Sequence, residues 1–176
     1  PDFLEQIMGR LKAMEADGGL ARMEKEMQDK TRGYANRPRS AGTYPRAVEA
    51  RSFNVDLSIT VAKDLSDQNG QVFAAAGTVV NPLAYSHFDK KIMFIDGDDA
   101  EQVAWAIAEG DELNSLIVMV QGAPLELMRK YGRRFWFDQD GIMARKFQIA
   151  NLPSRVTRAD PFMQVEEIVL PPKGDK

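Results

Sequence analysis

Few residues in this chain have the chemistry that a reaction centre requires. The sequence contains no cysteine and a single histidine, His87. Without cysteine there is no thiol nucleophile, zinc–thiolate site or dithiol redox pair. With one histidine and no Gly-x-Ser-x-Gly elbow, a hydrolase triad has no components. Neither a P-loop nor a Gly-x-Gly-x-x-Gly motif is present to cradle phosphates. The sequence therefore predicts a protein that is not an enzyme and that needs no cofactor.

Two acidic clusters are the remaining candidates for a metal site. The stretch that begins at Asp138 is similar to the opening of a calcium loop, which needs glycine at loop position six and glutamate at position twelve. Those positions are Met143 and Ile149, so the match fails. The run from Asp96 to Asp99 lies between a predicted strand and a predicted helix, where carboxylates cap backbone N–H groups and favour the helix dipole. We expect capping there and no metal.

A basic and aromatic stretch raises the question of nucleic-acid binding. Arg133 and Arg134 precede three consecutive aromatic residues, Phe135 to Phe137, on which bases could stack. Alternate side chains of a strand point to opposite faces, however, and such a run more often fills a core. The net charge of −3 also gives the whole molecule no attraction to a polyanion. We expect no nucleic-acid partner.

The elements that position these residues begin with two short helices. Residues 2–15 read as a helix that Asp2 caps, with Glu5 completing a capping box. Gly18-Gly19 ends it, and a second helix follows out of phase with the first. The apolar residues recur at coiled-coil spacing in the first helix and at helical spacing in the second, and they are the predicted partner-binding residues: Leu4, Ile7, Leu11, Met14, Met23 and Met27. Helices this short are marginal alone, so the hairpin docks either on its own domain or on another chain.

The rest of the chain divides by composition and periodicity. After the N-terminal helical arm (1–30), we expect a linker rich in Arg, Pro and Gly (31–52). Alternation from Phe53 to Val61 begins a small antiparallel β meander (53–90). Residues 91–172 then show an α/β pattern with a fully apolar strand, Leu116 to Val120, in a central position.

No apolar run approaches the ~20 residues that a membrane-spanning helix requires. The chain begins at Pro1 rather than methionine. This start is consistent with a removed signal peptide or with a trimmed chain, and the sequence does not separate the two.

Several longer segments resemble known families. Phe137 to Arg155, FDQDGIMARKFQIANLPSR, resembles the second half of a thioredoxin-like domain, in which a short helix leads through a cis-proline, here Pro153, into a hairpin. Segments 79–83, 94–105 and 117–124, with the opening Pro1 to Leu4, together resemble the TraW family, periplasmic proteins of F-type conjugative type IV secretion systems.

This resemblance implies a fold, a location and partners. The implied fold is α/β, with a thioredoxin-like C-terminal domain without cysteines, preceded by the β meander and the helical hairpin. The implied role is pilus assembly in the periplasm through contacts with TrbC-like and TraU-like proteins. The corner that carries the dithiol pair of thioredoxins corresponds to Asp96–Asp99, so redox activity is excluded. A redox-inactive, thioredoxin-like chaperone that binds substrates transiently is the alternative.

Overall fold

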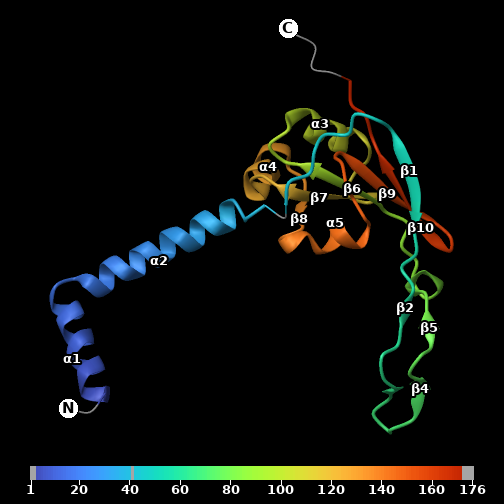
Figure 1. Ribbon diagram of the computed structural model, residues 1–176. Helices are drawn as coiled ribbons and strands as arrows, with labels where there is room; N and C mark the ends of the chain where they lie inside the picture. Colours follow the sequence, from blue (N-terminus) through green and yellow to red (C-terminus); the bar gives the residue numbers. More distant parts are fainter. Residues whose placement is uncertain (1–2, 41, 172–176) are drawn as a thin grey trace.

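A six-stranded mixed sheet lies at the centre of the computed structural model, which describes residues 3–40 and 42–171 (Figure 1). One half of the sheet is parallel and consists of β6 (Lys91–Asp96), β7 (Ser115–Gln121) and β8 (Phe135–Phe137). The other half is antiparallel and consists of β9 (Ser154–Ala159), β10 (Phe162–Glu167) and β1 (Arg51–Val55). β9 pairs with β6 and joins the halves. The chain is therefore a mixed α/β protein, as the sequence predicts.

Helices cover both faces of this sheet (Figure 1). They are α3 (Ala100–Ala108) and α4 (Pro124–Tyr131) on one face, and α5 (Ile142–Lys146) with a preceding 3-10 turn, η2 (Gln139–Gly141), on the other. Neighbouring residues of β6 point to opposite faces, so Ile95 packs with Val103 of α3 while Phe94 packs with Phe147 beside α5. The two phenyl rings meet edge to face, with centroids 5.9 Å apart. Each fully buried apolar side chain of this kind contributes about 1.5–3 kcal/mol.

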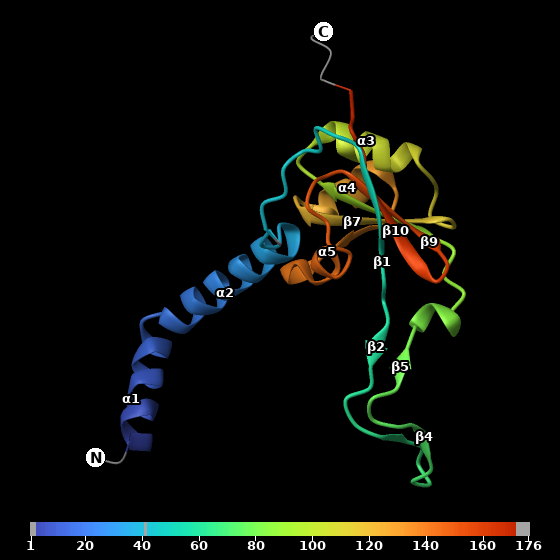
Figure 2. The ribbon, with the colours of Figure 1, turned by 45° about the vertical axis from the view of Figure 1, so that its right-hand side comes forward.

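An arm of two helices extends away from the sheet (Figures 1 and 2). These are α1 (Phe3–Ala16) and α2 (Gly19–Asn36), and neither contains a buried residue. Gly18 allows the bend between them because it adopts a left-handed conformation, with φ of 72°. The predicted cap Asp2 and the opening residue Pro1 lie outside the described residues.

The expected linker (31–52) is shorter than its composition suggested. Residues 31–36 continue helix α2, and Arg51 and Ser52 already belong to β1. Part of what remains is bound to the sheet domain: the Ala47 N–H donates to the Leu152 carbonyl at 2.7 Å, and the Leu152 N–H donates to the Pro45 carbonyl at 2.9 Å. Arginine and threonine are adequate helix residues, so the glycine at position 33 does not stop α2.

The expected meander (53–90) is wrong in its pairing. The predicted strand from Phe53 to Val61 is divided at residues 56–58, where the Ser58 N–H donates to the Asp56 carboxylate at 2.8 Å. Its first part is β1 and joins the main sheet, while the remainder forms a narrow extension, the β ribbon (residues 59–80) (Figure 2). The ribbon strands are β2 (Ile59–Thr60) paired with β5 (Val79–Val80), and β3 (Leu65–Ser66) paired with β4 (Val72–Ala74).

The ribbon is fastened to the sheet at its base. A 3-10 turn, η1 (Pro82–Ala84), follows β5, and Asn81 caps it through the Leu83 N–H at 2.9 Å. The Arg158 guanidinium of β9 donates to the carbonyls of Ser86 and Leu83 at 2.5 and 2.7 Å. These bonds fix the direction in which the ribbon leaves the sheet.

Two further features concern expectations from the sequence. The peptide bonds Leu152–Pro153 and Asp160–Pro161 are both cis, and the first is the bond for which the sequence predicts this geometry. Within residues 3–40 and 42–171, no helix has both the length and the apolar character needed to cross a bilayer.

Candidate partner-binding surface

The apolar residues predicted for α1 lie on one side of a helix that no other part of the chain described by the structure buries. Leu4 is 67% exposed, and Ile7 and Leu11 are 41% and 44% exposed. Met14 is half-buried near the bend. Phe3 and Met8, which the sequence analysis did not include, widen the stripe and are also exposed. A contiguous apolar surface of this kind on a protein marks an interaction site more often than isolated exposed residues do.

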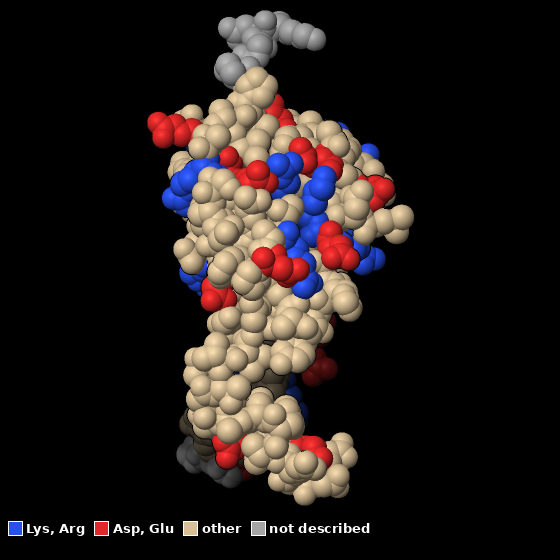
Figure 3. All heavy atoms as spheres, turned by 90° about the vertical axis from the view of Figure 1, so that its right-hand side faces the viewer, with Lys and Arg blue, Asp and Glu red and all other residues tan. Residues whose placement is uncertain are grey.

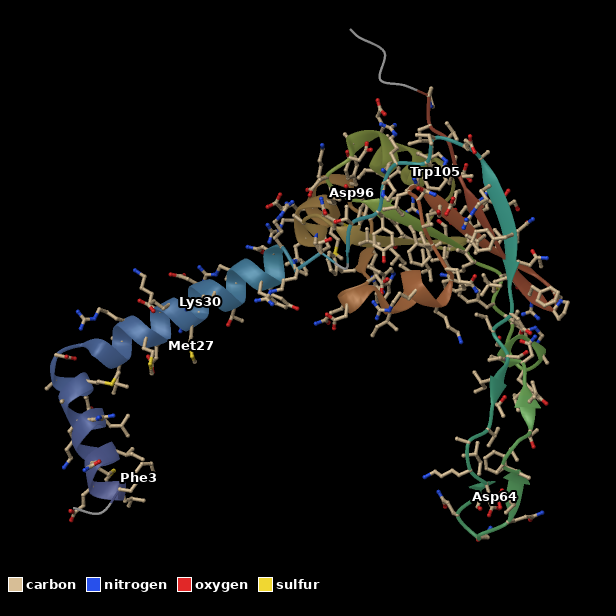
Figure 4. The ribbon with its side chains drawn as sticks, viewed as in Figure 1. Phe3, Met27, Lys30, Asp64, Asp96 and Trp105 are labelled. Carbon is tan, nitrogen blue, oxygen red and sulfur yellow. The ribbon has the colours of Figure 1, made fainter. Side chains whose placement is uncertain are left out.

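Helix α2 continues the apolar surface toward the sheet domain. Met23 and Met27 are exposed, as is Tyr34 in the last turn of the helix. Figure 4 shows Met27 on the side of α2 that faces the space between the arm and the β ribbon. Methionine side chains adapt to irregular surfaces, which suits a protein-binding face. The structure thus places all six predicted residues on the arm, with those of α1 and α2 separated by the bend at Gly18.

Polar contacts hold the base of the arm on the sheet domain. The Arg37 guanidinium pairs with the Asp98 carboxylate, and Arg46 pairs with Glu101 and lies 3.6 Å from Asp99. The Gln139 side-chain amide donates to the Tyr34 hydroxyl at 3.1 Å. Helix α2 also packs against α4. In the part of the chain that the structure describes, no hydrogen bond or ion pair joins residues 3–33 to the sheet domain.

The acidic corner after β6 acts as a helix cap, as the sequence predicts. The Asp99 carboxylate accepts hydrogen bonds from the backbone N–H groups of Glu101 and Gln102 at the start of α3, at 3.0 and 3.3 Å. The Asp96 carboxylate accepts from the Asp98 N–H at 2.9 Å. Burial is the main cause that raises the pKa of Asp96, and the charges of Asp98 and Asp99 add to it. No three potential ligands cluster as a metal site in the part of the chain that the structure describes.

Two buried carboxylates were not identified from the sequence. Asp138 accepts hydrogen bonds from the Met143 and Ala144 N–H groups and so holds the start of α5. The position of Asp138 a few residues before a predicted helix could have indicated this capping role. Glu167 accepts from the Ala150 and Asn151 N–H groups, both at 3.1 Å, and lies 3.4 Å from the Arg51 guanidinium. Its partners come from distant parts of the chain, so no local pattern predicts them.

The aromatic run divides between core and surface. Phe135 is buried in the core, whereas Trp136 is exposed and the Arg134 guanidinium lies 5.4 Å from its ring centre. Arg133 is directed inward, where it donates to the Ile107 carbonyl and the Ser115 hydroxyl at 3.1 and 2.5 Å. His87 lies exposed in the loop after η1. The side chains alternate along the strand as expected, but the aromatic run fills the core only in part, because Trp136 is exposed.

The β ribbon is a second exposed apolar surface, and sequence reasoning missed it. Phe73 and Val79 are 70% and 67% exposed, and Ile59 and Val72 are also exposed. Figure 3 shows few charged side chains on this part of the molecule, whereas charges gather over the sheet. Period-two alternation normally indicates a buried face, but a ribbon of two strands that leaves the sheet has no layer to bury it.

Comparison with known proteins gives one clear relationship. No family model matches the chain, and no solved structure matches it. The chain is 36% identical over 171 residues to Protein TraW of Escherichia coli (strain K12), and the alignment covers 96% of this chain and 81% of that protein. The chain belongs to the TraW family. Because the alignment covers nearly all of the chain, the relationship to TraW includes the helical arm and the β ribbon as well as the sheet.

Proposed function

We propose that this chain is a non-catalytic assembly component of an F-type conjugative type IV secretion system. In this proposal it acts in the periplasm, contributes to pilus assembly, and does so by binding TrbC-like and TraU-like proteins. Membership of the TraW family supports the system, and the exposed arm supports binding as the mode of action.

The observation that carries the proposal is the exposure of the whole arm. Two helices that span residues 3–36 contain no buried residue, yet each presents apolar side chains in a stripe. An amphipathic helix of this kind binds partners by placing its apolar face in a groove. Leucine or isoleucine side chains that become fully packed there contribute about 2–5 kcal/mol each against alanine.

The polar groups of the sheet domain support a structural rather than a catalytic role. The carboxylates of Asp99, Asp138 and Glu167 are each engaged by two or more backbone N–H groups. A carboxylate held in this way stabilises a loop or a helix start and is poorly placed to exchange protons with a substrate. A dithiol reaction is excluded by the absence of cysteine from the sequence.

We also propose that the sheet is a thioredoxin-like core without redox chemistry. Two connections support this. The corner Asp96–Asp99 lies between β6 and α3, where thioredoxins carry their cysteines, and α5 leads through Pro153 into the β9–β10 hairpin. In this proposal the core is a rigid base that carries the arm and the ribbon.

The proposal is tested by co-purification from cells that carry a complete transfer system. A tagged chain with Met23→Ala and Met27→Ala is compared with a control, Lys25→Ala and Asp29→Ala, whose positions lie on the opposite face of α2 by helical spacing. We expect the methionine variant to lose its partners and the control to retain them in fixed stoichiometry. Retention by both variants would show that this face of the arm is not the binding surface.

The same experiment separates the transient chaperone from the assembly component. A stable complex with one or two transfer proteins supports the proposal. Weak capture of many unrelated proteins, in no fixed ratio, would contradict it.

A further inference from the structure

Helix α1 has the residue pattern of a coiled-coil strand. With Leu4 at position a of a heptad, Ile7 falls at d, Leu11 at the next a and Met14 at the next d. The structure forms a continuous helix over Phe3–Ala16 and leaves the first three of these residues exposed. The seam is therefore ready to pack against another helix without any rearrangement of α1.

The charges that flank this seam are complementary to a second copy of the same helix. Arg10 falls at position g and Glu15 at the following e. In a parallel coiled coil, g of one helix faces the next e of its neighbour, so Arg10 would meet Glu15 of the other copy on both sides. In an antiparallel pair, Arg10 would approach another Arg10, and Glu15 would have no opposite charge.

Neither Arg10 nor Glu15 forms an ion pair with another described residue. Among the residues that the structure describes, the arm forms an ion pair only between Arg22 and Asp17 at the bend and between Arg37 and Asp98 at the base. Arg10 and Glu15 are both exposed. Their charges are available to an incoming helix.

The width of the apolar stripe on α1, and the area that two such helices can bury, indicate how strongly α1 associates with other copies. Phe3 at g and Met8 at e extend the apolar surface beyond the seam, and leucine at a with isoleucine at d favours more than two strands. Two heptads nevertheless bury less area than the ~1,200 Å² of a stable interface. Association through α1 alone is therefore weak and becomes effective where many copies are held together.

We propose that α1 associates in parallel, and in register, with α1 of other copies of this chain. The inference rests on the proposed function, in which the arm is a protein-binding surface, and it assigns α1 to self-association and leaves α2 for other proteins. The bend at Gly18 allows this, because α2 then directs each sheet domain outward by about 27 Å, at 1.5 Å for each of its 18 residues.

Cysteine cross-linking of the full chain tests the register, since the natural sequence contains no cysteine. Leu4→Cys and Met14→Cys are oxidised separately at high protein concentration, with Ala13→Cys, outside the seam, as the control. In a parallel assembly each seam variant cross-links to itself, at a rate roughly tenfold or more above the control because of its higher effective concentration. In an antiparallel assembly the two positions would be about 15 Å from their own copies, and cross-links would form only in a mixture of the two variants.

Charge reversal tests the partner's identity. Arg10→Glu and Glu15→Arg should each weaken self-association, measured by sedimentation, by roughly five- to tenfold, because each attractive g–e contact becomes repulsive. Mixing the two variants should strengthen association again, since each g–e pair between unlike variants is attractive. Unchanged association of the single variants, or cross-linking of the seam variants no faster than Ala13→Cys, would overturn the inference.

These measurements fail independently of the proposed function. A chain whose α1 does not self-associate but whose Met23 and Met27 are needed for co-purification retains the proposed function and loses only this inference. If the seam variants cross-link but the α2 variant keeps its partners, self-association through α1 is supported and the proposed binding through α2 is contradicted.

Discussion

At the scale of single residues, a buried acid joins several distant parts of the chain. Glu167 of β10 is 2% exposed and accepts three hydrogen bonds, two from the backbone of Ala150 and Asn151 and one from the Asn151 side chain. These bonds hold the segment that leads into Pro153 and β9. A buried carboxylate is tolerated only with such complete satisfaction of its oxygens.

We expect Glu167→Gln to lower the free energy of unfolding by about 2–3 kcal/mol, because one of the two carboxylate oxygens becomes an NH2 group, which cannot accept from the Asn151 side chain or pair with the Arg51 guanidinium. Urea unfolding of the variant and the natural chain measures the difference. Glu49→Gln, an exposed change in the segment before β1, is the control and should have little effect. Equal stability of both variants would mean that water replaces the lost contacts.

The raised pKa of Asp96 predicts how its contribution to stability depends on pH. Because burial raises this pKa in the folded protein, the folded state binds the proton more tightly than the unfolded chain. Ionisation therefore destabilises the fold as the pH rises from the ordinary aspartate pKa, about 3.9, through the folded-state pKa. Relative to the natural chain, Asp96→Asn should therefore have a higher free energy of unfolding at neutral pH than at acidic pH.

Urea unfolding at acidic and at neutral pH measures the difference in free energy of unfolding between the variant and the natural chain. The amide oxygen of asparagine can still accept from the Asp98 N–H, so the local turn is retained. Asp29→Asn, which removes the same charge from the exposed surface of α2, is the control. A variant that loses more stability at neutral than at acidic pH would contradict the direction.

At the scale of elements, local patterns predicted the helices and the central strands well. Spacing located α1 and α2, and the apolar run from Leu116 to Val120 located β7, an interior strand with a neighbour on each side that lies next to the edge strand β8 rather than at the centre. The β ribbon was misread because alternation reports the geometry of a strand and not whether a second layer covers it. The residues of β1 and β10 that pair lie more than a hundred positions apart in the sequence. Periodicity within one segment cannot predict such a pairing.

For the arm, we expect Leu4→Ala, Ile7→Ala and Leu11→Ala together to change the stability of the sheet domain by less than about 0.5 kcal/mol, as for other exposed substitutions. Both tryptophans, Trp105 and Trp136, lie in the sheet domain, so their fluorescence follows its unfolding alone. Ile117→Ala in the core is the control and should cost about 2–5 kcal/mol. A comparable loss in the triple variant would place the arm within the core.

At the scale of the whole molecule, the arm and the ribbon leave one compact sheet domain at different places, and both extend toward the lower part of the view (Figures 1 and 2). The ribbon is directed by hydrogen bonds from Arg158, whereas the arm is directed by packing of α2 against α4, by the exposed ion pair of Arg37 and by the half-buried ion pair of Arg46. Exposed ion pairs are weak and are screened by salt. The arm is therefore the more easily redirected of the two extensions.

We expect Asp98→Asn, or salt at about 1 M, to broaden the distribution of distances between the arm and the sheet domain. Spin labels at Lys25→Cys on α2 and Leu113→Cys in the loop before β7 report this distance, because the chain has no other cysteine. Asp17→Asn, which removes the pair with Arg22 at the bend, is the control and should leave the distribution unchanged. A distribution insensitive to both changes would mean that packing at α4 rather than charge sets the direction of α2.

The linker segment Pro45–Ala47 and an extended segment from another protein cannot both bind the backbone of Leu152. The Leu152 N–H and carbonyl are both taken by the chain's own linker, which forms a short parallel bridge at Arg46. An extended segment from another protein can reach this backbone only by displacing the linker. Displacement would remove Arg46 from Asp99 and Glu101 and leave α2 attached mainly through Arg37 and Tyr34. A segment that displaces the linker from the Leu152 backbone would thus allow α1 and α2 to change their direction relative to the sheet domain.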